Sequence, residues 1–167
     1  MACDSDVPPR ECETYTPTQM SESTAPRDAL TLNASDRPCC RVVTAGEAYV
    51  GRQNLSYVRG LTGTTVGSRG ICMTVATLPP GARAKAHLHR DIETAIYVID
   101  GEAATYYGDA LEHVAVARGG EYVYIPADLP HLVVNQSNDV CRAVVTHTAC
   151  DDQVGIEMLP HLDAVIA

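Results

Sequence analysis

Short β-rich runs separated by turn residues are the feature that most limits what this chain can fold into. From Arg41 onward, runs of roughly four to eight residues, rich in Val, Ile, Thr and Tyr, alternate with Gly, Pro, Asn or Asp. The runs are RVVTAGEAYVG, ICMTVATL, TAIYVIDG, AATYYG, HVAVA, EYVYIP, HLVVN and RAVVTH. No amphipathic stretch of helical length lies between them, so the pattern predicts an all-β sandwich or barrel.

The beginning of the chain has a different composition. Residues 1 to about 38 are rich in Ser, Thr, Pro, Asp and Glu, which is typical of a segment that cannot offset its ordering entropy by burial. We therefore expect a flexible N-terminal tail over residues 1–40, a barrel over residues 41–150 and a C-terminal extension over residues 151–167. Within the tail, the alternating segment DALTLN (residues 28–33) could add an edge strand to the domain or to a partner subunit.

The charge balance narrows the choice of partners. Twelve Lys and Arg against 21 Asp and Glu give a formal charge of -9, which repels nucleic acid and anionic membrane surfaces. No apolar run approaches the length of about 20 residues that spans a bilayer, and the N-terminus lacks the pattern of a signal peptide. Seven cysteines without C-x-x-C spacing indicate reduced thiols. We expect a cytoplasmic protein that binds neither nucleic acid nor membrane.

The aromatic composition constrains the core. The chain has eight Tyr and neither Phe nor Trp, so every tyrosine ring that becomes buried needs a partner for its hydroxyl. The core is therefore expected to be mainly aliphatic, and an aliphatic lining favours a small, partly hydrophobic ligand over a sugar.

Three histidines form the pattern that indicates chemistry. His87 and His89 stand one residue apart, so on a strand both imidazoles leave the same face, where they could bind one metal ion. Neutral imidazole is the commonest protein ligand for Zn, Fe, Ni, Cu and Mn. His131 follows the run EYVYIP and the turn ADLP, and it is the natural third ligand because a barrel lets ligands converge from different strands.

The segments around these histidines resemble the two sequence motifs of the cupin superfamily. Residues 81–101 read GARAKAHLHRDIETAIYVIDG, and residues 120–135 read GEYVYIPADLPHLVVN. The motif positions are filled by Gly81, His87, His89, Glu93 and Gly101 in the first and by Gly120, Pro126, His131 and Asn135 in the second. The resemblance implies a single-domain cupin, a double-stranded β-helix or jelly-roll barrel, with one divalent metal ion held by His87, His89, Glu93 and His131.

Two positions depart from the family's pattern. Asp128 stands where the second motif usually has Gly, which alters a turn without touching a ligand. Glu93 is separated from Gly101 by one residue more than in the family's motif. On a regular strand Thr94 would then face the metal and Glu93 the opposite side, because a slip of one residue reverses a side chain. A bulge near Ile92 could return Glu93 to the interior, so both ligand sets remain open.

Tyr122 and Tyr124 are the candidate catalytic residues. They share one face of the run EYVYIP, and if that face is internal, a phenol beside the metal could donate a proton or orient a substrate oxygen. The alternative is that they cover the outer surface or a subunit contact. His113, His147 and His161 have no ligand spacing with the motif histidines, and His147 reads as a structural histidine of the last core strand.

These observations favour a metal-dependent enzyme acting on a small molecule. With Fe(II), two or three histidines leave positions where a chelating substrate and O₂ can bind together, which is the arrangement of a mononuclear non-haem iron dioxygenase and our first expectation. With Zn, Ni or Mn, activation of a carbonyl would support an isomerase, cyclase or lyase. A non-catalytic small-molecule-binding cupin is the third alternative. Because sheet edges invite pairing and cupins commonly dimerise, we expect a homodimer.

Overall fold

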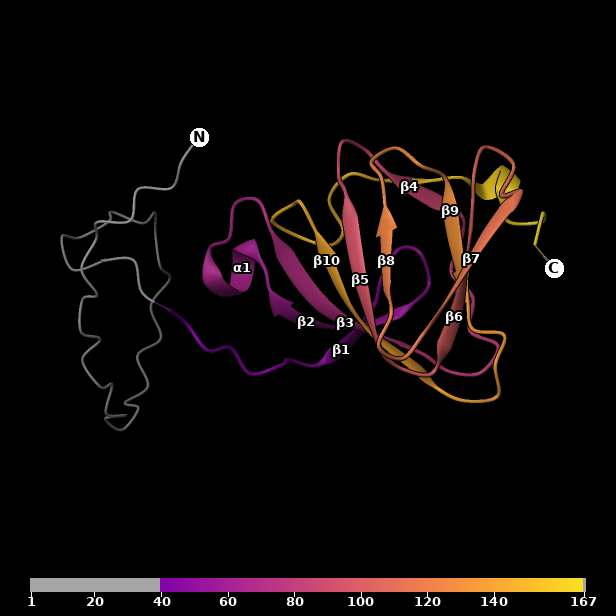
Figure 1. Ribbon diagram of the computed structural model, residues 1–167. Coiled ribbons are helices and arrows are strands. Elements are labelled where there is room, and N and C mark those ends of the chain that lie inside the picture. The colour runs from indigo at the N-terminus through magenta and orange to yellow at the C-terminus, as the bar shows by residue number, and fades with distance from the viewer. Residues whose placement is uncertain (1–39, 167) are drawn as a thin grey trace, which may run out of the picture. The chain divides into compact units, whose positions relative to one another are not determined.

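The computed structural model describes residues 40–166, and their architecture is the predicted all-β barrel. Two antiparallel sheets face one another (Figure 1). The predicted tail over residues 1–40, with its DALTLN segment, lies outside the described residues except for its last position. No helix in the described part of the chain is long and apolar enough to cross a membrane.

The first sheet has six strands in the order β1-β2-β3-β10-β5-β8. Their bounds are β1 Ala48–Val50, β2 Ser56–Leu61, β3 Cys72–Leu78, β10 Cys141–His147, β5 Thr94–Asp100 and β8 Tyr122–Ile125. The sequence pattern missed β2, whose run is interrupted by Arg59 and Gly60. A register shift lies at this point of the β2–β3 pair, and a Cβ on Gly60 would lie 2.8 Å from the carbonyl oxygen of Met73. Glycine therefore allows a close approach of the two strands here.

The second sheet has five strands in the order β11-β4-β9-β6-β7. Their bounds are β11 Ile156–Met158, β4 His87–His89, β9 His131–Val134, β6 Glu102–Tyr107 and β7 His113–Arg118. The remaining elements are the one-turn helix α1 (Gly63–Val66) and the 3-10 turn η1 (Pro160–Leu162). β11 pairs with β4, so the segment after residue 150 supports the strand that carries the first two motif histidines.

The core lies between the sheets and is aliphatic, as the composition predicts. In β3 and β10 every second residue is buried, which is the alternation of strands with one face toward a core. The inward residues of these two strands include Ala76, Leu78, Ala143 and Val145. Tyr57 is the one buried tyrosine among the described residues.

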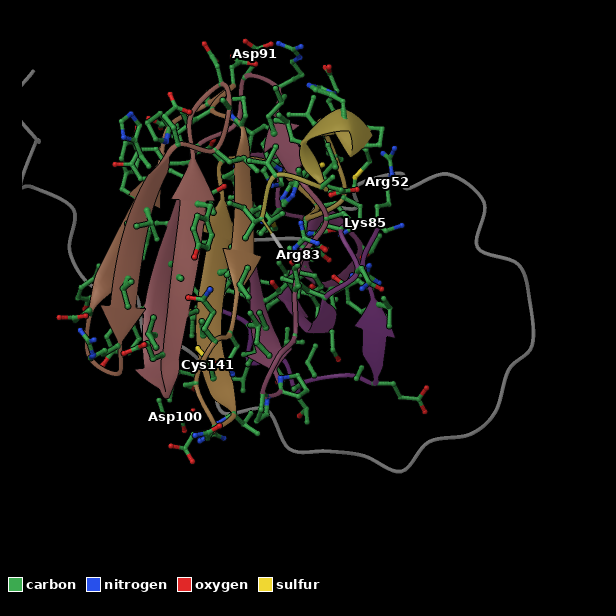
Figure 2. All side chains as sticks on the ribbon, turned by 90° about the vertical axis from the view of Figure 1, so that its right-hand side faces the viewer. Arg52, Arg83, Lys85, Asp91, Asp100 and Cys141 are labelled. Atoms are coloured by element: carbon green, nitrogen blue, oxygen red, sulfur yellow. The ribbon has the colours of Figure 1, made fainter. Side chains whose placement is uncertain are left out.

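Tight turns close the two ends of the barrel. Figure 2 shows Asp91 and Asp100 at opposite ends, with β5 running between them. At the Asp100 end, Gly101 has φ 75°, and a Cβ there would lie 2.5 Å from the carbonyl oxygen of Val140. The motif residue Asn135 is fully buried, and its amide donates to the carbonyl oxygens of Leu78 and Asp139 at 2.8 and 2.7 Å. Both motif residues therefore have structural roles in turns.

Candidate metal centre

Three histidines from two neighbouring strands meet inside the barrel. β4 is three residues long, and because side chains alternate along a strand, His87 and His89 leave the same face. His87 pairs with His131, the first residue of β9. All three rings are buried, and their potential ligand atoms lie within 4.8 Å of one another. The structure thus brings together the three histidines that the sequence predicts, in a group that could hold one metal ion.

Backbone carbonyls orient two of the rings. Nδ1 of His87 lies 2.8 Å from the carbonyl oxygen of Lys85, and Nδ1 of His131 lies 2.9 Å from that of Leu129. A carbonyl oxygen can only accept, so each Nδ1 carries the proton and each Nε2 keeps its lone pair. A hydrogen bond of this kind from the second ring nitrogen is the usual support of a metal-binding histidine.

The electrostatics of the cluster favour neutral rings. Burial, with a smaller effect of the neighbouring imidazoles, lowers the pKa of His87 to about 4 and the pKa values of His89 and His131 to about 3. Neutral imidazole is the form that binds metals. In addition, Nδ1 of His89 is buried without a hydrogen-bond partner among the described residues. A buried polar atom without a partner is costly, and a coordinating ion at this cluster would account for its retention.

The turn before His131 is hydrogen-bonded to β4. Asp128, at the position where the cupin motif usually has Gly, has φ 61°, in the left-handed region that Asp tolerates better than most residues. Its backbone N–H donates to the carbonyl oxygen of His89 at 2.9 Å. Asp128 therefore preserves the turn that the motif usually makes with Gly. Its hydrogen bond to His89 helps to set the distance between His89 and His131.

Glu93 does not join the cluster. It is exposed, and its carboxylate accepts a hydrogen bond from the Tyr124 hydroxyl. The next residue, Thr94, begins β5 and is buried, with Oγ1 2.9 Å from Nδ1 of His147. Since successive side chains of a strand point to opposite faces, a register that turns Thr94 inward turns Glu93 outward. The pairing of β5 with β10 is regular from Thr94 to Val98, and its register shift lies at the other end of the strand, next to Asp100. No shift at the start of β5 returns Glu93 to the interior.

Tyr122 and Tyr124 also lie away from the histidines. Their side chains are 79% and 61% exposed on the outer face of β8. The Tyr122 ring packs on that of Tyr97, with centroids 4.8 Å apart. The opposite face of β8 supplies Val123 to the interior. The alternation of β8 therefore directs its apolar residues into the barrel and its tyrosines to the surface, where they cannot donate a proton into the cavity.

Comparison with known proteins agrees with this architecture. The family model described as the cupin domain matches residues 74–147, from β3 to the end of β10. Together with the two sheets and the motif histidines, this match decides the family. The chain contains a cupin domain. No curated protein sequence matches the chain.

Several solved structures share the fold. The polyketide cyclase RemF from Streptomyces resistomycificus aligns with a TM-score of 0.58 and 21% identity over 73% of this chain and 86% of its own. A predicted oxalate decarboxylase from Thermotoga maritima has a TM-score of 0.53 and 15% identity over 64% and 93%. The cupin domain of Cnp3 from Schizosaccharomyces pombe has a TM-score of 0.51 and 12% identity over 64% and 69%. At these identities the likeness shows the fold alone.

A fourth imidazole lies inside this cupin barrel. His147, the last residue of β10, is buried, and its ring centroid is 4.7 Å from that of His89. Burial lowers the pKa of His147 as well. Its lack of ligand spacing with the motif histidines predicts only a structural role for it. The alternation of the run RAVVTH could have predicted its inward orientation, because His147 lies on the same face of the strand as Ala143 and Val145.

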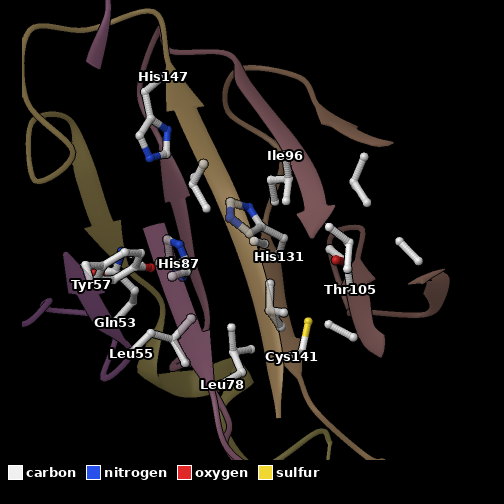
Figure 3. Close-up of a pocket in the computed structure, with 18 of the residues that line it drawn as sticks. Gln53, Leu55, Tyr57, Leu78, His87, Ile96, Thr105, His131, Cys141 and His147 are labelled. Atoms are coloured by element: carbon white, nitrogen blue, oxygen red, sulfur yellow. Dashed lines mark hydrogen bonds between the residues drawn. The ribbon is translucent and has the colours of Figure 1, made fainter. Parts of the chain in front are cut away.

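The cavity of the cupin barrel has a volume of about 60 Å³. Figure 3 shows His87, His131 and His147 among the residues that line it. Most of the others are apolar, including Leu55, Leu78, Ile96, Val98, Val133 and Val145. Three further polar side chains, those of Gln53, Tyr57 and Thr105, also line it, and they lie in segments without a recognised motif that would have selected them. The cavity therefore combines a cluster of imidazoles, an apolar wall, a threonine hydroxyl and one amide–phenol pair.

Proposed function

We propose that this cupin is a metal-dependent enzyme that polarises a carbonyl group of a small, mainly apolar molecule. The observation that supports the proposal is the composition of the site. Three buried imidazoles with depressed pKa values converge in an apolar cavity, and no carboxylate or cationic side chain lines that cavity among the described residues. Such a site favours a neutral ligand with an oxygen directed at the histidines.

His87, His89 and His131 would hold one divalent ion. Bound there, the ion would supply Lewis-acid activation of a carbonyl oxygen. The carbonyl oxygens of Lys85 and Leu129 fix the orientation of two ligand rings before the ion binds. The aliphatic walls exclude water, and a low-polarity surrounding strengthens electrostatic interactions inside the site.

The charge of the ligand set favours Lewis-acid chemistry over oxygen activation. A set of neutral histidines leaves the full charge of the ion to polarise a carbonyl, whereas many non-haem iron oxygenases use two histidines and one carboxylate. Glu93, the one carboxylate that the motif offers, points away from the cavity. We therefore favour an isomerase, cyclase or lyase with Zn, Ni or Mn. The name of one structural relative, a polyketide cyclase, is consistent with this choice.

A non-haem iron dioxygenase is the second candidate. Three protein ligands leave several positions of a six-coordinate ion open, and this arrangement allows a chelating substrate and O₂ to bind side by side. The apolar cavity would accommodate the apolar part of such a substrate equally well.

Metal analysis and substrate screening test the proposal together. The full-length protein, purified without chelators, should contain close to one divalent ion per chain by elemental analysis. It should then convert members of a panel of small ketones and hydroxyketones under anaerobic conditions. Conversion that requires O₂ would identify the dioxygenase instead, and a protein that binds no metal would contradict both reactions and leave the non-catalytic binding cupin.

We also propose that the protein is a homodimer. β8 is an edge strand of the six-stranded sheet, and its outer face, with that of β5, exposes Tyr97, Ile99 and Tyr122. Exposed aromatic and apolar side chains on one sheet face are typical of subunit contacts. Sedimentation equilibrium should give a dimer for the wild type and a monomer for Tyr97→Lys; a wild-type monomer would contradict this proposal.

A further inference from the structure

Gln53 and Tyr57 form a buried polar pair on the cavity wall. Gln53 precedes β2 and is 2% exposed, and Tyr57 lies in β2 and is 5% exposed. Nε2 of Gln53 donates to the Tyr57 hydroxyl oxygen at 2.8 Å. Both residues line the same cavity as the motif histidines (Figure 3).

The pair is held in one hydrogen-bonded frame with His87. The carbonyl oxygen of Gln53 accepts the backbone N–H of Lys85 at 2.8 Å. The carbonyl oxygen of Lys85 accepts the Nδ1 proton of His87 at 2.8 Å. A displacement of Gln53 would therefore move Lys85, whose carbonyl oxygen orients the His87 ring. The position of the amide–phenol pair relative to the metal-ligating cluster is fixed by the backbone.

A buried carboxylate sets the direction of the hydrogen bonds. Asp152 is 1% exposed, and its Oδ2 lies 2.6 Å from Nε2 of Gln153. A carboxylate accepts, so Gln153 donates, and its Nε2 also lies 3.5 Å from Oε1 of Gln53. With its oxygen turned toward Gln153, Gln53 must present its nitrogen to Tyr57. The chain of donors therefore runs from Gln153 to Gln53 and from Gln53 to Tyr57.

This direction leaves the proton of Tyr57 unused. A phenol is both donor and acceptor, and here its oxygen accepts from Gln53. Among the hydrogen bonds of the described residues, none has the Tyr57 hydroxyl as donor. Burial raises the pKa of Tyr57 above its ordinary value, so the hydroxyl stays protonated at neutral pH. A buried donor without an acceptor is costly, and the open space next to it is the cavity.

We propose that Tyr57 is a specificity-determining residue that donates a hydrogen bond to a neutral carbonyl oxygen of the ligand, and that Gln53 is its positioning residue. This inference rests on the proposed function in that the ligand shares the cavity with the metal site. It adds a second anchor on the ligand and defines its class: a small, uncharged, mainly apolar molecule with a carbonyl oxygen directed at Tyr57.

The rest of the cavity supports this class. Its lining contains no Lys, Arg, Asp or Glu among the described residues, so no side chain of the wall would pair with a charged group at Tyr57. A volume of about 60 Å³ is small, since one buried water needs roughly 10–15 Å³ by this measure. Ligands with only a few non-hydrogen atoms fit such a space, and cyclopentanone is a suitable probe.

The experiment compares a ketone with its carbon isostere. Cyclopentanone labelled with ¹³C at the carbonyl, and methylenecyclopentane, are titrated into full-length protein in its metal-free and Zn-loaded forms, with binding followed by NMR. The wild type should bind the ketone more tightly than the hydrocarbon in both forms. Tyr57→Phe should weaken ketone binding roughly 3- to 10-fold, the range expected for one hydrogen bond, without affecting the hydrocarbon. The ¹³C resonance of the bound carbonyl should also lose its downfield shift.

Control variants separate this role from a general effect on folding. Tyr106→Phe removes a hydroxyl that accepts from Gln136 on the outside, and it should leave ketone binding unchanged. Gln53→Leu should reduce the preference for the ketone, because Tyr57 is then no longer oriented. If Tyr57→Phe does not fold, the wild-type protein alone tests the inference. Equal affinity for cyclopentanone and methylenecyclopentane, or no binding of the ketone, would overturn it.

The two proposals can fail separately. Ketone binding that depends on Tyr57 in a protein that proves to hold no metal would contradict the proposed reaction and support the inference. A metal-containing protein that converts ketones equally well with Phe at position 57 would contradict the inference and support the reaction.

Discussion

Thr94 Oγ1 lies 2.9 Å from Nδ1 of His147, and both residues are buried. This contact is the consequence of the β5 register that turns Glu93 outward. It supports a fourth imidazole, whose ring centroid lies 4.7 Å from that of His89, in a site where the resemblance to cupins implies a carboxylate ligand.

Replacing Thr94 with Val should destabilise the protein. The substitution preserves shape but leaves the buried Nδ1 of His147 without its partner, so we expect the free energy of unfolding to fall by ~1–3 kcal/mol. Urea denaturation measures it. Thr146→Val on the opposite face of β10 is the matched control and should change stability by less than ~0.5 kcal/mol. Equal effects at the two positions would contradict a special role for the Thr94–His147 bond.

Replacing His131 with Ala should abolish stoichiometric metal binding. The variant removes one of three convergent ligands, and His113→Ala removes an exposed histidine of β7 as a control. Elemental analysis of both proteins after dialysis should find metal in the control only. Full occupancy of His131→Ala would show that the ion binds elsewhere.

Replacing Glu93 with Gln should leave metal content unchanged, since this carboxylate points to the surface and accepts from Tyr124. The comparison is made by elemental analysis and by competition with a chromogenic chelator. A clear loss of affinity, of tenfold or more, would indicate that Glu93 turns inward when the ion binds.

The metal-free protein should lose stability as the pH falls below about 6.5. An unfolded histidine titrates near 6.5, whereas His87 in the folded state has a pKa of about 4. Between these values the unfolded chain binds a proton that the folded chain does not, so the free energy of unfolding falls with decreasing pH. For His87 alone the full loss is ~3 kcal/mol, at about 1.4 kcal/mol per pKa unit. Urea titrations from pH 7.5 to 4.5 measure this slope.

A reduced slope in His87→Leu would support the assignment of this effect. Saturation with Zn should protect the wild type down to lower pH, because the ion binds only the neutral rings. A stability that stays constant from pH 7.5 to 4.5 would show that the histidines are not buried in their neutral form.

Replacing Gly101 with Ala should be far more costly than replacing Gly81 with Ala. Both glycines have φ near 75°, which strains any residue with a Cβ by about 1 kcal/mol. At Gly101 that Cβ would also lie 2.5 Å from the Val140 oxygen, whereas nothing lies within 4 Å at Gly81. We expect a loss of ~1 kcal/mol for Gly81→Ala and several for Gly101→Ala, measured by thermal unfolding. Similar losses would show that the β5–β6 turn can move away from Val140.

The local pattern of the sequence determined the fold class and the three central histidines. The alternation of short runs depends only on which residues are apolar, and the H-x-H spacing places two rings on one face of any strand. Both properties are local, so they can be predicted without knowing which strands pair. The strands that such patterns missed are β2, interrupted by Gly60, and β11, which is three residues long and is stabilised by pairing with β4.

The tertiary structure decided which side chains share the cavity. The orientation of Glu93 and Thr94 depends on whether the chain bulges before β5, and the pairing of β5 with β10 and β8 removes that ambiguity. His147 and Tyr57 enter the cavity because β10 and β2 belong to the sheet that faces β4 and β9. A strand's alternation shows that two faces exist, but only packing against a second sheet shows which face is inside.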